Sequence, residues 1–137
     1  MKFSSNASLF LSCIFFLACG TTTSDAQQVR AAIASIEAAA ENRDSSDVLA
    51  QVSDAYADSQ DWDKAQLQNF LRGYFLLHPK LELLVKVESL VFPADGLAQA
   101  EISVASVGLD PQLLYLKVEF RRHDKVWLVT RADRASR

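Results

Sequence analysis

His78 is the residue of this 137-residue chain whose type and position best suit acid–base chemistry. It continues an apolar helical stripe, and histidine titrates near neutral pH. No Asp–His partnership is visible in the sequence, because Asp61 and Asp63 lie at the opposite end of the predicted helix. We favour the interpretation that His78 is a helix-terminal residue that hydrogen-bonds to the last carbonyls and is stabilised by the helix dipole. We therefore predict no catalytic residue.

Aromatic side chains are the second group of candidate functional residues, because they could line a pocket and stack against a flat, apolar ligand. The alternative is that they belong to the core or its rim, where aromatic residues at these spacings are common. Lys117 and Glu119 are expected on a solvated sheet face, unless a strongly curled sheet turns them into a polar cavity. The candidate pocket-lining residues are Tyr56, Trp62, Tyr74, His78, Tyr115 and Trp127.

Several classes of function are excluded by composition. The chain has two histidines, and both of its cysteines lie within the first 19 residues, so a tetrahedral zinc site is not expected. With four glycines it has neither a glycine-rich phosphate loop nor a nucleophile elbow. A net charge of −3 offers no basic surface for nucleic acid. We predict no metal, no cofactor and no nucleic-acid partner.

The N-terminus has the layout of a secretory signal peptide: the cation Lys2, an apolar run over 9–18, and then small polar residues. The run is too short to span a bilayer. The segment 16–20, which contains Cys19, resembles the lipobox of bacterial lipoproteins. That resemblance implies that residues 1–18 are removed and that Cys19 carries a diacylglyceryl group and an N-acyl chain such as palmitate. A secreted protein cleaved after Ala18 without lipidation is the alternative.

The remaining chain is long enough for one domain. We expect residues 19–26 to form the lipidated N-terminus and a polar tether, and residues 27–137 to form the domain. Apolar residues at helical spacing predict a first helix over 27–42 and a short second helix capped by Ser45 or Ser46 and extending to Val52. A capping box formed by Asp63 and Gln66 predicts a third helix that ends at His78.

Beyond residue 80 the apolar period changes from helical spacing to two, which predicts strands. The first strand shows a change of parity that indicates a bulge near Ser89. Turns at 93–96, 108–111 and 123–125 separate it from three more strands, and the last has Trp127, Val129 and Arg131 on one parity. About three N-terminal helices followed by a four-stranded antiparallel meander make an α+β domain.

This order of elements, with the closing strand 126–131, resembles the nuclear transport factor 2-like superfamily, also called SnoaL-like or cystatin-like, over residues 27–133. The resemblance implies a curved sheet that wraps around the helices as a cone with an apolar cavity. Some members of the superfamily are dehydratases, isomerases or polyketide cyclases, and many others are noncatalytic binding or accessory domains. Fold alone does not choose among these functions.

We therefore expect a cell-envelope lipoprotein anchored to the membrane through Cys19. Gly20 rather than aspartate follows Cys19, and by resemblance to lipoproteins of two-membrane bacteria this favours the periplasmic face of the outer membrane if the source has two membranes. Its expected role is noncatalytic: binding a small apolar ligand, or acting as an accessory or interaction module that could form a homodimer through the sheet. The alternative is an isomerase or dehydratase that acts on a hydrophobic substrate in the cone.

Overall fold

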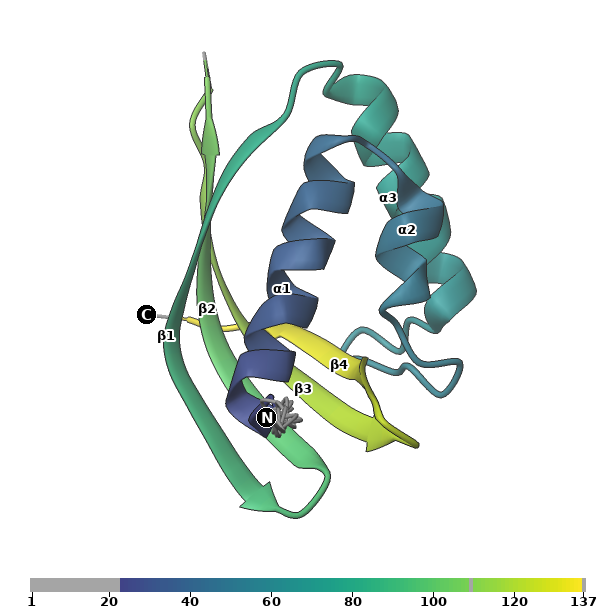
Figure 1. Cartoon of the computed structure of the whole chain (residues 1–137). Helices are drawn as coiled ribbons and strands as arrows, with labels where there is room; N and C mark the ends of the chain where they lie inside the picture. The colour runs from purple at the N-terminus through teal and green to yellow at the C-terminus, as the bar shows by residue number, and fades with distance from the viewer. Residues whose placement is uncertain (1–22, 109, 137) are drawn as a thin grey trace, which may run out of the picture.

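The computed structural model describes residues 23–108 and 110–136 and contains three helices followed by four strands (Figure 1). The strands form one antiparallel sheet in the order β1-β2-β3-β4, which confirms the predicted α+β class and meander. The predicted signal peptide and Cys19 lie outside the described residues. The elements are α1 (Asp25–Glu41), α2 (Ser45–Ala50), α3 (Lys64–Leu77), β1 (Glu82–Ala94), β2 (Leu97–Val107), β3 (Leu113–His123) and β4 (Val126–Arg134).

Two capping boxes fix where the long helices begin. At α3 the Asp63 side chain accepts the Gln66 N–H, and the Gln66 side chain accepts the Asp63 N–H, as the sequence predicts. At α1 the same arrangement joins Ser24 and Gln27. Because Ser24 is the cap, α1 begins at Asp25, and the two residues before the predicted start at Gln27 belong to the helix rather than to a tether.

The cap of α2 differs from the prediction. The side chain of Asp44, rather than that of Ser45 or Ser46, accepts the Asp47 N–H. The reason is the tight connection from α1, in which Arg43 takes a left-handed conformation with φ of 55° and so brings Asp44 to the helix start. The helix also ends earlier than predicted, and Val52 forms an isolated parallel bridge to Val129.

Bulges decide which strand residues face the helices. The register of β1 against β2 shifts between Val87 and Ser89, which confirms the predicted bulge. Another shift, between β3 and β4, leaves Thr130 as the extra residue on β4. This bulge reverses the parity after Val129, so Arg131 is exposed rather than in line with Trp127 and Val129.

The sheet curves around α1 as a cone (Figure 1). Its side chains are more buried at one end, which we call the base, than at the other, which we call the mouth. The base is the end with the β1–β2 hairpin and the start of α1, where Ala98 and Phe120 are both 0% exposed. The mouth is the end with the β2–β3 turn and the end of α3. There the inward-facing Val104 and Leu114 are only half-buried, and Leu77 is 79% exposed. Side-chain packing therefore loosens from base to mouth.

No helix within 23–108 or 110–136 is both long and apolar enough to cross a membrane.

Candidate functional site

The sheet and the three helices surround an apolar cavity of about 220 Å³. An apolar cavity of roughly 150 Å³ in another protein stays dry and takes up benzene, so this one has room for a one-ring ligand. Every lining residue has an apolar side chain except Glu37 and Tyr56. The lining residues are Ile33, Ile36, Glu37, Ala40, Val48, Val52, Tyr56, Leu67, Leu71, Leu83, Val85, Ile102, Val104, Leu116, Val118, Phe120, Val129 and Ala132.

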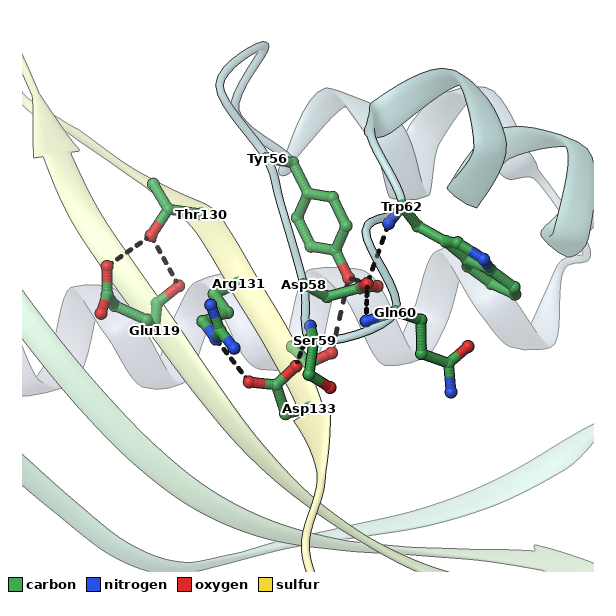
Figure 2. A network of polar contacts seen from close by, with 10 residues as sticks. Tyr56, Asp58, Ser59, Gln60, Trp62, Glu119, Thr130, Arg131 and Asp133 are labelled. Carbon is green, nitrogen blue, oxygen red and sulfur yellow. Dashed lines mark hydrogen bonds and ion pairs between the residues drawn. The ribbon is translucent and has the colours of Figure 1, made fainter.

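Tyr56 contributes its ring to the cavity wall and its hydroxyl to the loop between α2 and α3 (Figure 2). The hydroxyl donates to the Asp58 carboxylate at 2.9 Å and lies 3.5 Å from the Ala132 carbonyl oxygen. Burial, and then the hydrogen bond to Asp58, raise the pKa of Tyr56 well above its usual range. The same carboxylate accepts the N–H groups of Gln60 and Trp62. The Tyr56 hydroxyl thus stays protonated and is already engaged.

A second carboxylate fastens this loop to β4. Asp133 accepts the Ser59 N–H at 2.8 Å and pairs with Arg131 (Figure 2). Burial acts to raise the pKa of Asp133, but these hydrogen bonds outweigh burial and hold it below its usual value. Nearby, the Thr130 hydroxyl donates to the Glu119 carboxylate at 3.0 Å. The polar network therefore holds the Tyr56 loop in place.

The aromatic residues of α3 and the loop before it stack along the helix. The ring centroids of Trp62 and Phe70 lie 5.2 Å apart, those of Phe70 and Tyr74 6.0 Å, and those of Tyr74 and His78 4.0 Å. The Nδ1 of His78 lies 2.8 Å from the Tyr74 carbonyl oxygen, so this nitrogen carries the proton and donates it. None of these four side chains lines the cavity. His78 occupies the C-terminal cap of α3.

The last two predicted residues also lie away from the cavity. Tyr115 pairs with Ser103 across β2 and β3, on the sheet face turned away from the helices. Trp127 is 3% exposed at the base, with the Arg122 guanidinium 5.4 Å from its ring and Phe92 packed edge-on. Of the six candidate pocket residues, the structure thus places Tyr56 in the cavity wall and the other five elsewhere.

Of the lining residues that the sequence did not single out, Glu37 is the one with a charged side chain. It is half-buried and lies on α1, between Ile36 and Ala40 in the cavity wall. One turn later, Glu41 accepts the Leu83 N–H of β1 at 3.0 Å, which shows that this side of α1 faces the sheet. The sequence signal that could have revealed it is an acidic residue on the apolar face of an alanine-rich helix.

The outer face of the sheet is charged, as predicted for Lys117. That side chain is 67% exposed and lies 4.0 Å from the Glu101 carboxylate. Glu119 is partly covered and pairs with Arg121 at 3.2 Å. Within the part of the chain that the structure describes, no group of three or more histidine, cysteine or acidic side chains could hold a metal ion.

Solved structures with the same architecture are similar to this chain at low sequence identity. A domain of unknown function with a cystatin-like fold from Nostoc punctiforme is 14% identical, covers 85% of this chain and 80% of its own, and has a TM-score of 0.71. A putative scytalone dehydratase from Novosphingobium aromaticivorans is 10% identical, with coverages of 82% and 83% and a TM-score of 0.69.

A nuclear transport factor 2-like protein of unknown function from Shewanella oneidensis is 11% identical, with coverages of 81% and 98% and a TM-score of 0.66. No protein-family model matches the sequence, and no curated protein matches it. At these identities the likeness concerns the fold. The chain has the cystatin-like, or nuclear transport factor 2-like, α+β fold.

Proposed function

We propose that this protein is a noncatalytic, lipid-anchored protein of the cell envelope whose cone binds a small apolar ligand. The observation that carries the proposal is the cavity of about 220 Å³, whose wall is apolar apart from Glu37 and Tyr56. An apolar ligand in a cavity of this size would make packing contacts with the aliphatic side chains of its wall. A well-formed apolar pocket with few polar groups is typical of small-molecule sites.

The position of the mouth supports a ligand that arrives from the aqueous phase. Arg122 binds both Asp25 at the start of α1 and Asp95 in the β1–β2 hairpin, so the N-terminal end of the domain lies at the base. The mouth lies at the other end of α1 (Figure 1), about 25 Å away for a helix of 17 residues. With Cys19 as the anchor, the base would face the membrane and the mouth would face away from it.

Native mass spectrometry tests the binding function. The protein, purified from its source without added ligand, should carry a noncovalent mass of small-molecule size that disappears on denaturation. A chain that is always ligand-free, and takes up no one-ring apolar compound when one is offered, would rule the function out.

The anchor has a separate test. Cys19→Ser should abolish fatty-acid labelling and release the domain from membranes. Stable attachment needs more than one acyl chain, which the diacylglyceryl and N-acyl groups would provide together. Continued membrane association of the unlabelled variant would show that the anchor is not Cys19.

An isomerase or dehydratase remains the alternative enzymatic function. It would need two polar groups that converge on a bound substrate, and Glu37 and Tyr56 are the two lining residues whose side chains carry polar groups. The Tyr56 hydroxyl already donates its hydrogen to Asp58, so it is not positioned to give a proton to a substrate. Turnover of a hydrophobic substrate that is lost in both Glu37→Gln and Tyr56→Phe would favour the enzyme over the binding protein.

A homodimer through the sheet is a second candidate role, favoured by one row of side chains. Leu84, Ala105 and Leu113 lie side by side across three strands on the outer face, and Leu84 and Leu113 are 65% and 60% exposed. A second copy could cover this row. Light scattering coupled to size exclusion should then show a dimer that Leu84→Glu converts to a monomer.

A further inference from the structure

We propose that the ligand of the cone is a hydrocarbon, a neutral molecule that carries no hydrogen-bonding group. This inference rests on the proposed function, because it names the chemical class of the ligand that the cavity holds. It narrows that class, because it excludes alcohols, phenols, amines and carboxylic acids even when the rest of the molecule is apolar.

The first argument is the surface of the cavity, which is almost entirely apolar. Apart from Glu37 and Tyr56, every lining side chain is aliphatic or the ring of Phe120. Because so little polar surface reaches the cavity, Glu37 and Tyr56 contribute their carbon atoms to the wall rather than their oxygen atoms. A ligand therefore meets carbon atoms along almost the whole wall.

The second argument is that the polar groups nearest the cavity already have partners. The Tyr56 hydroxyl donates to the Asp58 carboxylate at 2.9 Å, on the side of the loop between α2 and α3 (Figure 2). The strands of the wall pair their backbone groups with one another, in the plane of the sheet rather than toward the cavity. No lysine, arginine or histidine is among the lining residues. The wall thus offers neither a free donor nor a cation.

The third argument compares what different ligands lose and gain on entry. A ligand with a hydroxyl, amine or acid group would give up its hydrogen bonds to water and find no replacement in the cavity. A hydrocarbon has no such bonds to lose, and it gains dispersion contacts with the aliphatic wall. A cavity of about 220 Å³ has room for one ring with a short alkyl substituent. The cavity therefore selects against polar groups more strongly than it selects a particular shape.

Toluene and phenol test the proposal, because they have nearly the same size and differ in a methyl group against a hydroxyl group. Both are neutral near pH 7, where their affinities for the full chain are measured by ligand-observed NMR. Toluene should bind at least about 30-fold more tightly, which corresponds to about 2 kcal/mol, the lower end of the cost of burying an unpaired hydroxyl group. A smaller ratio would overturn the hydrocarbon assignment and leave the apolar ligand site intact.

Two variants on β2 attribute this ratio to the wall of the cavity. Val104 is half-buried and lines the cavity, and Val104→Thr keeps the shape of the side chain but brings a hydroxyl group into the wall. The new hydrogen bond to phenol should narrow the ratio about fivefold. Val107→Thr is the matched control, because it makes the same change on the same strand at an exposed position outside the cavity, and it should keep the ratio.

The outcomes separate the two proposals. A ratio that narrows equally in Val104→Thr and Val107→Thr would show that the probes bind outside the cavity, and would overturn the assignment. A folded wild-type protein that binds neither toluene nor phenol would refute the apolar ligand site itself, and the hydrocarbon assignment with it.

Discussion

Filling the cavity from α1 should stabilise the domain and block its site. Ala40 lines the cavity near the mouth, and leucine has nearly the same helix propensity as alanine. Ala40→Leu adds three carbon atoms, each worth about 0.8 kcal/mol when fully buried. Because Ala40 is half-buried, we expect about half of that sum, a gain of about 1 kcal/mol in the free energy of unfolding. The midpoint of thermal unfolding should rise by about 5 °C.

The assay is urea denaturation followed by circular dichroism, with toluene binding measured on the same samples. Ala38→Leu is the matched control, because it places the same side chain on the exposed face of the same helix. It should leave both stability and binding near the wild-type values. The reasoning would be refuted if Ala40→Leu were no more stable than Ala38→Leu and still bound toluene, since the cavity would then not be the space that a ligand occupies.

Two further changes test other contacts. Tyr56→Phe removes the hydrogen bond to Asp58 and should cost about 1 kcal/mol in urea denaturation. Folding raises the pKa of Tyr56, so the wild type should also lose stability as the pH rises above the usual tyrosine value of 10.0. Tyr56→Phe should lose less stability over the same pH range. Equal losses in the two proteins would contradict the burial of the hydroxyl. Asp63→Ala removes the cap of α3 and should cost about 1 kcal/mol, whereas Asp63→Asn keeps a capping side-chain oxygen and should cost less. Equal costs for the two variants would argue against the cap.

Features set by neighbours in the sequence could be predicted. The capping box at Asp63 needs residues three apart, and the bulge near Ser89 appears as a change of apolar parity along one strand. The helix-terminal position of His78 follows from Pro79, which disfavours helical geometry in the residue before it. In each case a local steric or hydrogen-bonding rule leaves few alternatives.

Features set by contacts between distant parts of the chain could not be predicted from the sequence. The bulge at Thr130 depends on the pairing of β4 with β3, and the sequence after Val129 has no strong alternation to reveal it. That bulge turns Ala132, rather than Arg131, toward the cavity. Likewise the inward position of Glu37 depends on how far the sheet curves around α1. The sequence therefore predicted an apolar cavity, but of the six residues predicted to line it only Tyr56 does so.

Methyl NMR spectra recorded during a toluene titration test the central claim most directly. If the cone is a ligand site, the methyl signals of Ile33, Val104 and Leu116 should shift together and saturate, because these residues line the cavity. The signals of Leu76, which is 83% exposed, should stay nearly constant. Shifts confined to Leu76 and other exposed side chains, with the cavity methyl groups unchanged up to the solubility of toluene, would contradict the account.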